Sequence, residues 1–146
     1  MKRPRRAAGV PAVLALCALL AVACGSKSNS TSTGGAGPVP RPTSNVQLQI
    51  VSPTPDEVVT SSSTLLEVNL VGGSVVPPAQ VSGPLRGDQG HIHVSVDGKL
   101  VTMAYTTSYE ITGLTPGKHA VQAEFVAVDH LPFNPRVVNS VLFEVK

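Results

Sequence analysis

The stretch HIHVSVDGKLVTMAY, residues 91–105, decides the fold class because it has the pattern of a single β-hairpin. In its first half Ile92, Val94 and Val96 alternate with polar residues, which is typical of a strand with one buried face. Asp97-Gly98 follows, and this dipeptide is a strong signal for a two-residue hairpin turn. The stretch therefore predicts an antiparallel sheet.

The same two-residue period recurs on both sides of this hairpin. Apolar and polar residues alternate in VQLQI (46–50), LLEVNL (65–70), KHAVQAEF (118–125) and SVLFEV (140–145). Thirteen prolines argue against long helices. We predict one domain, residues 46–146, folded as an all-β, immunoglobulin-like antiparallel β-sandwich of about seven strands, with a small closed barrel as the alternative. A long loop over residues 77–90 is a candidate functional segment.

The N-terminus has the parts of an export signal. Four basic residues precede an apolar run over residues 12–23. As a helix this run is about 18 Å long, too short for roughly 30 Å of hydrocarbon. The segment from Ala21 to Cys24 resembles the lipobox of bacterial lipoproteins, although Leu20 stands one place earlier than the usual leucine. We predict a lipoprotein signal peptide (1–23), a lipid on Cys24 and a position on the extracytoplasmic face of the cell membrane. Ordinary secretory cleavage and an uncleaved anchor are the alternatives.

Cleavage at this point changes the composition of the working protein. The four basic residues of the signal leave, so that seven basic and nine acidic residues remain and the formal charge is −2. A mildly acidic chain with five aromatic residues and no Trp is a poor candidate for binding nucleic acid. Cys17 leaves as well and Cys24 is blocked by lipid, so no thiol remains for a disulfide or a thiolate metal site. Residues 24–45 are rich in Ser, Thr, Gly and Pro and predict a flexible tether.

Two histidines of the hairpin are candidate metal ligands. His91 and His93 are two residues apart on one strand and therefore lie on the same face. The third ligand is expected from His130, Asp129 or Met103. Imidazole with thioether favours copper, whereas imidazole with carboxylate suits zinc. The alternative is that both histidines are polar residues on a solvated strand face.

The remaining histidine, His119, is expected to have a structural role. It follows the turn Thr115-Pro116-Gly117, at a corner where many sandwich domains use a tyrosine to hold a backbone turn. With Pro116, Gly117 and the hairpin residues Asp97 and Gly98, it belongs to the turns that we predict to shape the fold.

Residues 90–146 resemble a family of exported bacterial domains of unassigned function. The hallmarks of that family are a Gly-His-x-His strand ending in Asp, a Leu-x-Pro-Gly-x-His turn, an Asp-His pair and a closing Pro-x-Val-x-Ser strand. In this chain they fall on Gly90, His91, His93, Asp97, Leu114, Pro116, Gly117, His119, Asp129, His130, Pro135, Val137 and Ser140, the last two with altered spacing. Ile92 and Phe133 stand where the family often has further histidines. The resemblance implies a sandwich fold in an extracytoplasmic setting.

Nothing in the sequence predicts an enzyme. There is no Gly-x-Ser-x-Gly elbow, and the acidic residues alternate on outer strand positions or lie beside turns. The first functional hypothesis is a lipid-anchored, non-catalytic module that binds a protein or another ligand. The second is a metal-binding envelope lipoprotein, for copper before zinc, and the third is a structural envelope protein.

Overall fold

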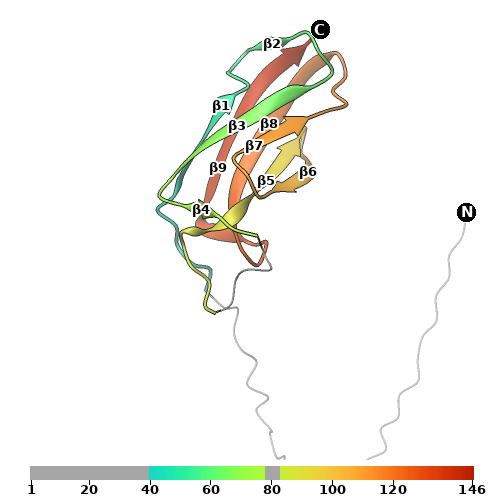
Figure 1. Ribbon diagram of the computed structural model, residues 1–146. Helices are drawn as coiled ribbons and strands as arrows, with labels where there is room; N and C mark the ends of the chain where they lie inside the picture. Colours follow the sequence, from blue (N-terminus) through green and yellow to red (C-terminus); the bar gives the residue numbers. More distant parts are fainter. Residues whose placement is uncertain (1–39, 78–82) are drawn as a thin grey trace, which may run out of the picture. The chain divides into compact units, whose positions relative to one another are not determined.

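The computed structural model describes residues 40–77 and 83–146 (Figure 1). Within these residues the chain forms strands and no helix. The nine strands are β1 (Gln47–Ser52), β2 (Val58–Val59), β3 (Thr64–Val71), β4 (Ser74–Val75), β5 (Gln89–Val96), β6 (Lys99–Ala104), β7 (Ser108–Ile111), β8 (Gly117–Ala127) and β9 (Pro132–Val145).

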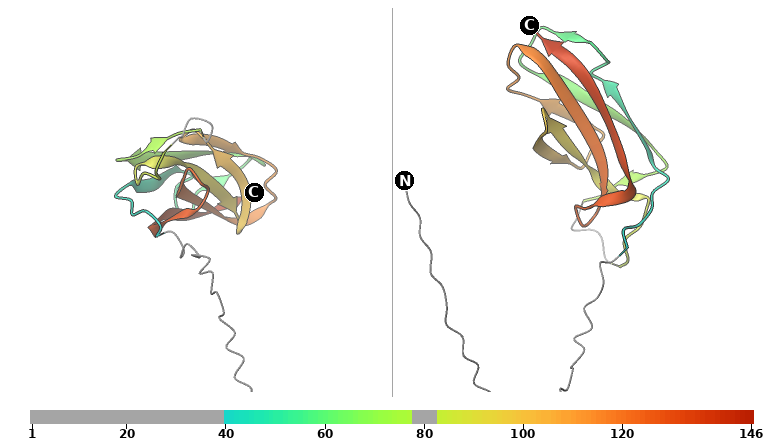
Figure 2. Two further views of the ribbon diagram at one scale, coloured as in Figure 1. Left: turned by 90° about the horizontal axis from the view of Figure 1, so that it is seen from below. Right: turned by 180° about the vertical axis from the view of Figure 1, so that it is seen from behind.

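The strands form two sheets that pack on each other. The smaller sheet has the order β1-β3-β7, and the larger has the order β2-β9-β8-β5-β4, with β6 also paired to β5. All pairings are antiparallel except those of the two short strands β2 and β4. Figure 2 shows β8 and β9 side by side along the larger sheet. The predicted immunoglobulin-like sandwich is confirmed, with two short strands that the sequence did not indicate.

The core lies between the sheets and is built from the alternating positions. Ile92, Val94, Val121 and Phe125 are at most 1% exposed, and Phe125 stacks on Phe133 with ring centroids 5.5 Å apart. Each such side chain contributes about 1.5–3 kcal/mol when it leaves water. The opposite positions of the same strands face outward, and these positions carry the candidate ligands.

The predicted hairpin is present, with its turn at Asp97-Gly98. Val96 pairs with Lys99, which leaves Asp97 and Gly98 as the two turn residues. Both have positive φ, 50° and 79°, as a type I′ turn requires. A register shift between Val94 and Ser95 then pairs His93 with Met103; without this shift His93 would pair with Thr102.

The N-terminal end of the described chain differs from the tether prediction. The composition predicts a flexible tether over residues 24–45, but Arg41, Pro42 and Ser44 all form hydrogen bonds to the sandwich. The signal peptide, Cys24 and the tether up to residue 39 lie outside the described residues, as do residues 78–82 of the predicted 77–90 loop. Among the described residues no helix is long and apolar enough to cross a membrane.

Candidate metal site

Three histidines meet at one end of the larger sheet. His91 and His93 belong to β5, and His130 lies in the turn between β8 and β9. Each offers a ring nitrogen, and these atoms all lie within 4.8 Å of one another. This end of the domain is the one opposite the C-terminus (Figure 1). Two segments almost 40 residues apart in sequence therefore supply one cluster of imidazoles.

His91 is fully buried although it lies on the outer face of its strand. Its ring is 5.2 Å from that of Tyr105 and 4.5 Å from that of His130, measured between centroids. These rings cover His91, whereas His93 is partly exposed and His130 is exposed. The cluster thus has a closed inner end and an open outer end through which an ion can enter.

Gly90 determines how closely β5 approaches β8 beside His91. A side-chain carbon at this position would meet the carbonyl oxygen of Val126 on β8. Only glycine leaves room for that approach. The glycine of the Gly-His-x-His motif therefore has a packing role next to the first histidine.

His130 occupies a strained position in a tight turn. The His130 N–H donates to Ala127 O (2.9 Å) and the Ala127 N–H donates to Leu131 O (3.1 Å), which closes a three-residue hairpin loop. The φ of His130 is 66°, a left-handed conformation that is about 1–2 kcal/mol unfavourable for residues other than glycine. A histidine in a position suited to glycine indicates that its side chain matters.

The protonation states of the two strand histidines suit metal binding. Burial lowers the pKa of His91 to about 4, with further lowering by His130 and His93. Burial also lowers the pKa of His93, followed by the effect of His130, while Glu124 acts in the opposite direction. Both rings are therefore neutral at pH 7, and a neutral imidazole is the form that binds a metal.

The two strand histidines contact each other through their ring nitrogens. Nε2 of His91 lies 3.1 Å from Nε2 of His93, so one nitrogen donates to the other. Nδ1 of His91 is buried and has no hydrogen-bond partner among residues 40–77 and 83–146. A buried polar atom without a partner is unfavourable by about 1–3 kcal/mol. Two nitrogens on one tetrahedral ion at 2.0–2.1 Å lie about 3.3 Å apart, so the histidine pair already has nearly the separation that a shared ion needs.

Of the other predicted ligands, Met103 lies beside the cluster and Asp129 is engaged elsewhere. Met103 is the cross-strand neighbour of His93 and is 40% exposed. Asp129 accepts two hydrogen bonds from Arg41. On the other side of His93, Glu124 is held by Arg136 through two hydrogen bonds of 2.7 and 2.6 Å.

His119 lies at the far end of β8 from His130 and binds two turns together. Its Nδ1 is 2.7 Å from Asp97 Oδ2, and its Nε2 is 2.7 Å from the carbonyl oxygen of Thr115. Asp97 also accepts a hydrogen bond from the Ala120 N–H (2.8 Å). The ring thus joins the β5–β6 hairpin to the turn before β8.

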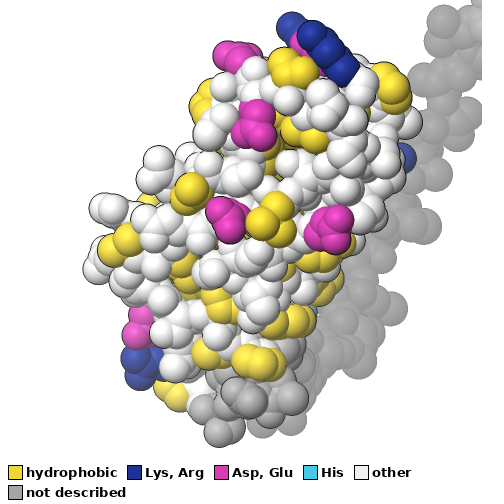
Figure 3. All heavy atoms as spheres, turned by 45° about the horizontal axis from the view of Figure 1, so that its top comes forward, with side chains coloured by type: hydrophobic (Ala, Val, Ile, Leu, Met, Phe, Trp, Pro, Cys, Tyr) yellow, Lys and Arg dark blue, Asp and Glu magenta, His cyan; other side chains and the backbone are white. Residues whose placement is uncertain are grey.

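A hollow of about 320 Å³ lies beside His119, lined also by Val101, Ile111 and Leu114. It is open to solvent, and its polar groups Asp97 and His119 are already bonded to each other. On the face in Figure 3, hydrophobic side chains stand in separate groups among polar and acidic ones. The three-histidine cluster is therefore the better candidate for a functional site.

Two residues of the site environment were not predicted from the sequence. Tyr105 covers His91, and Arg41 holds the turn that carries His130. No pattern in the sequence connects Arg41 to a turn 88 residues away. Tyr105 follows Ala104, the last residue of β6, and the register shift in the β5–β6 ladder, which the sequence did not predict, decides which residues of β5 it lies beside.

Comparisons with known proteins add little about function. No family model matches the chain, and no curated protein is significantly similar to it. Among solved structures, the fibronectin(III)-like modules of CbhA from Clostridium thermocellum are similar, with a TM-score of 0.46 and 14% identity. The match covers 68% of this chain and 96% of that chain. A likeness of this size carries no conclusion about function.

Proposed function

We propose that this protein is a lipid-anchored, extracytoplasmic metal-binding module that holds one transition-metal ion through His91, His93 and His130. The observation that carries the proposal is the convergence of three imidazoles, from β5 and from a separate turn, within 4.8 Å. Three histidine ligands with an open outer position suit copper and zinc. The 3.1 Å separation between Nε2 of His91 and Nε2 of His93 supports the same reading.

Copper is the favoured metal because of Met103. Its thioether is a soft ligand, and soft ligands select Cu(I) over zinc. Met103 lies opposite His93 in the β5–β6 ladder, where paired side chains are about 5 Å apart at their Cβ atoms. Imidazole ligands bind Cu(II) without a thioether. Met103 is therefore expected to affect mainly the affinity for Cu(I).

Binding is favoured over catalysis because the carboxylate beside His93 is already paired with an arginine. A metal-dependent hydrolase uses a free carboxylate or similar base to activate water. Glu124 is next to His93 in the sheet, but its side chain is 9% exposed and paired with Arg136. We therefore expect the site to hold and release an ion without turnover of a substrate.

Titration with Cu(II), Cu(I) and Zn(II), followed by calorimetry, tests this function. The purified full chain carries serine in place of Cys17 and Cys24, so that no thiol competes for the metal. His130→Gly removes one ligand and relieves the left-handed strain, so weaker binding is not caused by a weaker fold. We expect at least about 10-fold weaker binding for His130→Gly and a larger loss for His91→Ala.

His119→Gln is the matched control, since it removes a histidine that is remote from the cluster. We expect it to leave metal affinity unchanged. Met103→Leu should weaken Cu(I) binding and leave Zn(II) binding as it is. Equal affinities in the wild type and in His91→Ala would overturn the proposed function.

A further inference from the structure

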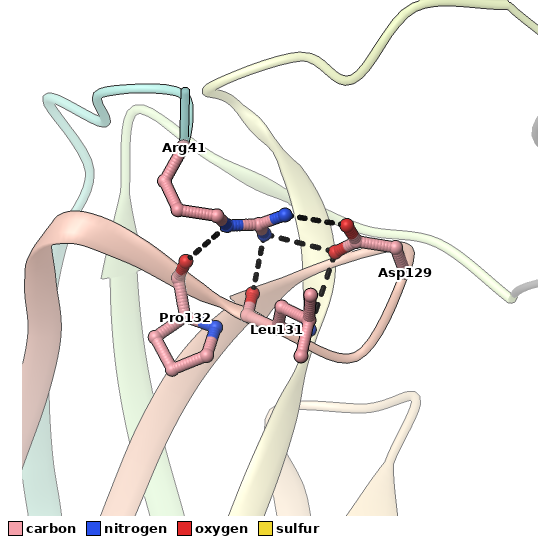
Figure 4. A network of polar contacts seen from close by, with 4 residues as sticks. All are labelled: Arg41, Asp129, Leu131 and Pro132. Atoms are coloured by element: carbon pink, nitrogen blue, oxygen red, sulfur yellow. Dashed lines mark hydrogen bonds and ion pairs between the residues drawn. The ribbon is translucent and has the colours of Figure 1, made fainter. Parts of the chain in front are cut away.

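Arg41 forms a dense set of contacts with the turn that carries His130. Its guanidinium donates to both carboxylate oxygens of Asp129, at 2.5 and 2.9 Å. It also donates to Leu131 O at 2.9 Å and to Pro132 O at 2.8 Å. Figure 4 shows the fork of Arg41 between these groups. One side chain therefore holds the residue before His130 and the two residues after it.

The segment around Arg41 also contacts the approach to β5. Ser44 Oγ donates to Gly87 O at 2.6 Å, two residues before β5 begins. Gly87 has no room for a side chain, because the carbonyl of Thr43 lies against it. On the other side, the Asn134 N–H donates to Pro42 O at 3.1 Å. Residues 40–45, named here the docked segment, thus join the two elements that supply the three histidines.

The contacts of Arg41 have the strength to hold a strained turn. A bidentate arginine–carboxylate pair is stronger and more directional than a hydrogen bond between neutral groups. Arg41 and Asp129 are only 25% and 32% exposed, and the pair lowers the pKa of Asp129 through the hydrogen bond from Arg41. Without Arg41, Pro132 O loses the Arg41 donor, the Asp129 carboxylate keeps only the Leu131 N–H, and Leu131 O keeps only the Ala127 N–H. The turn is then free to relax from the left-handed conformation of His130.

We propose that Arg41 is a positioning residue for His130, and that metal binding and attachment of the docked segment to the sandwich are thermodynamically coupled. The inference rests on the proposed metal-binding function. Because coupling free energies are reciprocal, a bound ion tightens the docked segment, and release of the docked segment weakens metal binding. In sequence, the docked segment is the described part of the chain that is nearest to Cys24, the predicted lipid anchor. This coupling therefore links metal affinity to the attachment of the docked segment, which follows the predicted tether in sequence.

Affinity measurements on the thiol-free full chain test this coupling. Arg41→Gln should weaken Cu(II) binding about 10-fold, the size typical of lost support around a metal ligand. Arg86→Gln is the matched control. Arg86 forms the same two-pronged pair with Asp88, at 2.9 and 2.7 Å, and in the described part of the chain neither side chain hydrogen-bonds to the turn that carries His130. The Arg86→Gln variant should therefore bind Cu(II) with the affinity of the wild type.

A double-mutant cycle separates positioning of His130 from general stabilisation of the fold. In a His130→Gly background, Arg41→Gln should have no further effect on Cu(II) affinity. Electron paramagnetic resonance gives an independent readout. We expect three coordinating nitrogens in the wild type and two in Arg41→Gln.

The outcomes distinguish the inference from the proposed function. If the wild type does not bind Cu(II), the proposed function fails. If it binds, and His130→Gly weakens binding while Arg41→Gln does not, only the coupling is overturned. The coupling is also overturned if Arg41→Gln weakens Cu(II) binding equally in the wild-type and His130→Gly backgrounds.

A measurement on the wild type avoids any folding defect of the variants. Hydrogen exchange of the Asn134 amide reports on its bond to Pro42 and hence on the docked segment. We expect saturating Cu(II) to slow this exchange about 10-fold. An unchanged rate would contradict the coupling.

Discussion

His119 is a residue whose surroundings favour its charged form. Both ring nitrogens face acceptors, Thr115 O and the Asp97 carboxylate, and only the imidazolium can donate to both. These hydrogen bonds raise the pKa of His119, with that to Thr115 as the larger cause. Between its ordinary pKa of 6.5 and the raised folded value, the folded state keeps a proton that the unfolded chain loses.

This sign sets the pH dependence of a His119→Gln variant. The contribution of His119 to stability is complete below pH 6.5 and is lost as the pH rises through the folded pKa. The variant should be about 1–2 kcal/mol less stable than the wild type at pH 5.5, with a smaller difference at pH 9. Urea unfolding at both pH values measures this.

Asp97→Asn is the companion variant at the same turn. Asn tolerates the left-handed conformation of this position, so the turn is preserved while the charge is removed. An NMR titration should show the pKa of His119 moved down toward its ordinary value. A difference between His119→Gln and the wild type that grows with pH would contradict this account of the pair.

At the scale of the element, β5 combines a buried inner face with a histidine-bearing outer face, and Gly90 determines its distance from β8. Gly90→Ala places a carbon against the Val126 carbonyl and pushes the strands apart. We expect a loss of about 1–3 kcal/mol in the free energy of unfolding. Metal affinity should fall as well, because His91 follows directly. Ser95→Ala, on the outer face of the same strand, is the control and should stay within about 0.5 kcal/mol. A Gly90→Ala variant as stable as this control would disprove the packing role.

The strand β9 shows where sequence patterns were insufficient. The sequence predicted a strand from Ser140, whereas β9 begins at Pro132. Two prolines lie in this first half, and prolines usually indicate a chain outside a sheet. The register explains how they are accommodated: Val126 pairs with Pro132 while Phe125 pairs with Val137, so residues 133–136 bulge out of the ladder. Within this bulge, Phe133 is buried in the core. Arg136 donates a hydrogen bond to Glu124.

At the scale of the whole molecule, the sandwich and the predicted anchor together would determine where the proposed metal ion is held. If residues 24–39 form the tether that their composition predicts, its root-mean-square reach is about 22 Å. Cys24→Ser should move the protein from the membrane fraction to the soluble fraction and abolish incorporation of labelled palmitate, because the lipid is its proposed anchor. Membrane retention of this variant would indicate an uncleaved signal instead. Cys17→Ser, in the signal itself, is the control and should remain lipidated.

The sequence alone determined the fold class, the turn of the β5–β6 hairpin and the position of His91 and His93 on one face of a strand, whereas the register beyond the turn depends on a shift between Val94 and Ser95 that the sequence did not predict. These properties are local, since period-two alternation and a two-residue turn define a hairpin without reference to the rest of the chain. Only the tertiary structure decided that His130 joins that pair and that Asp129 is held by Arg41. It also decided that His91 is buried under Tyr105, which lowers its pKa to about 4. These contacts join segments distant in sequence, and their geometry follows from how two sheets and one bulge pack, which no local pattern encodes.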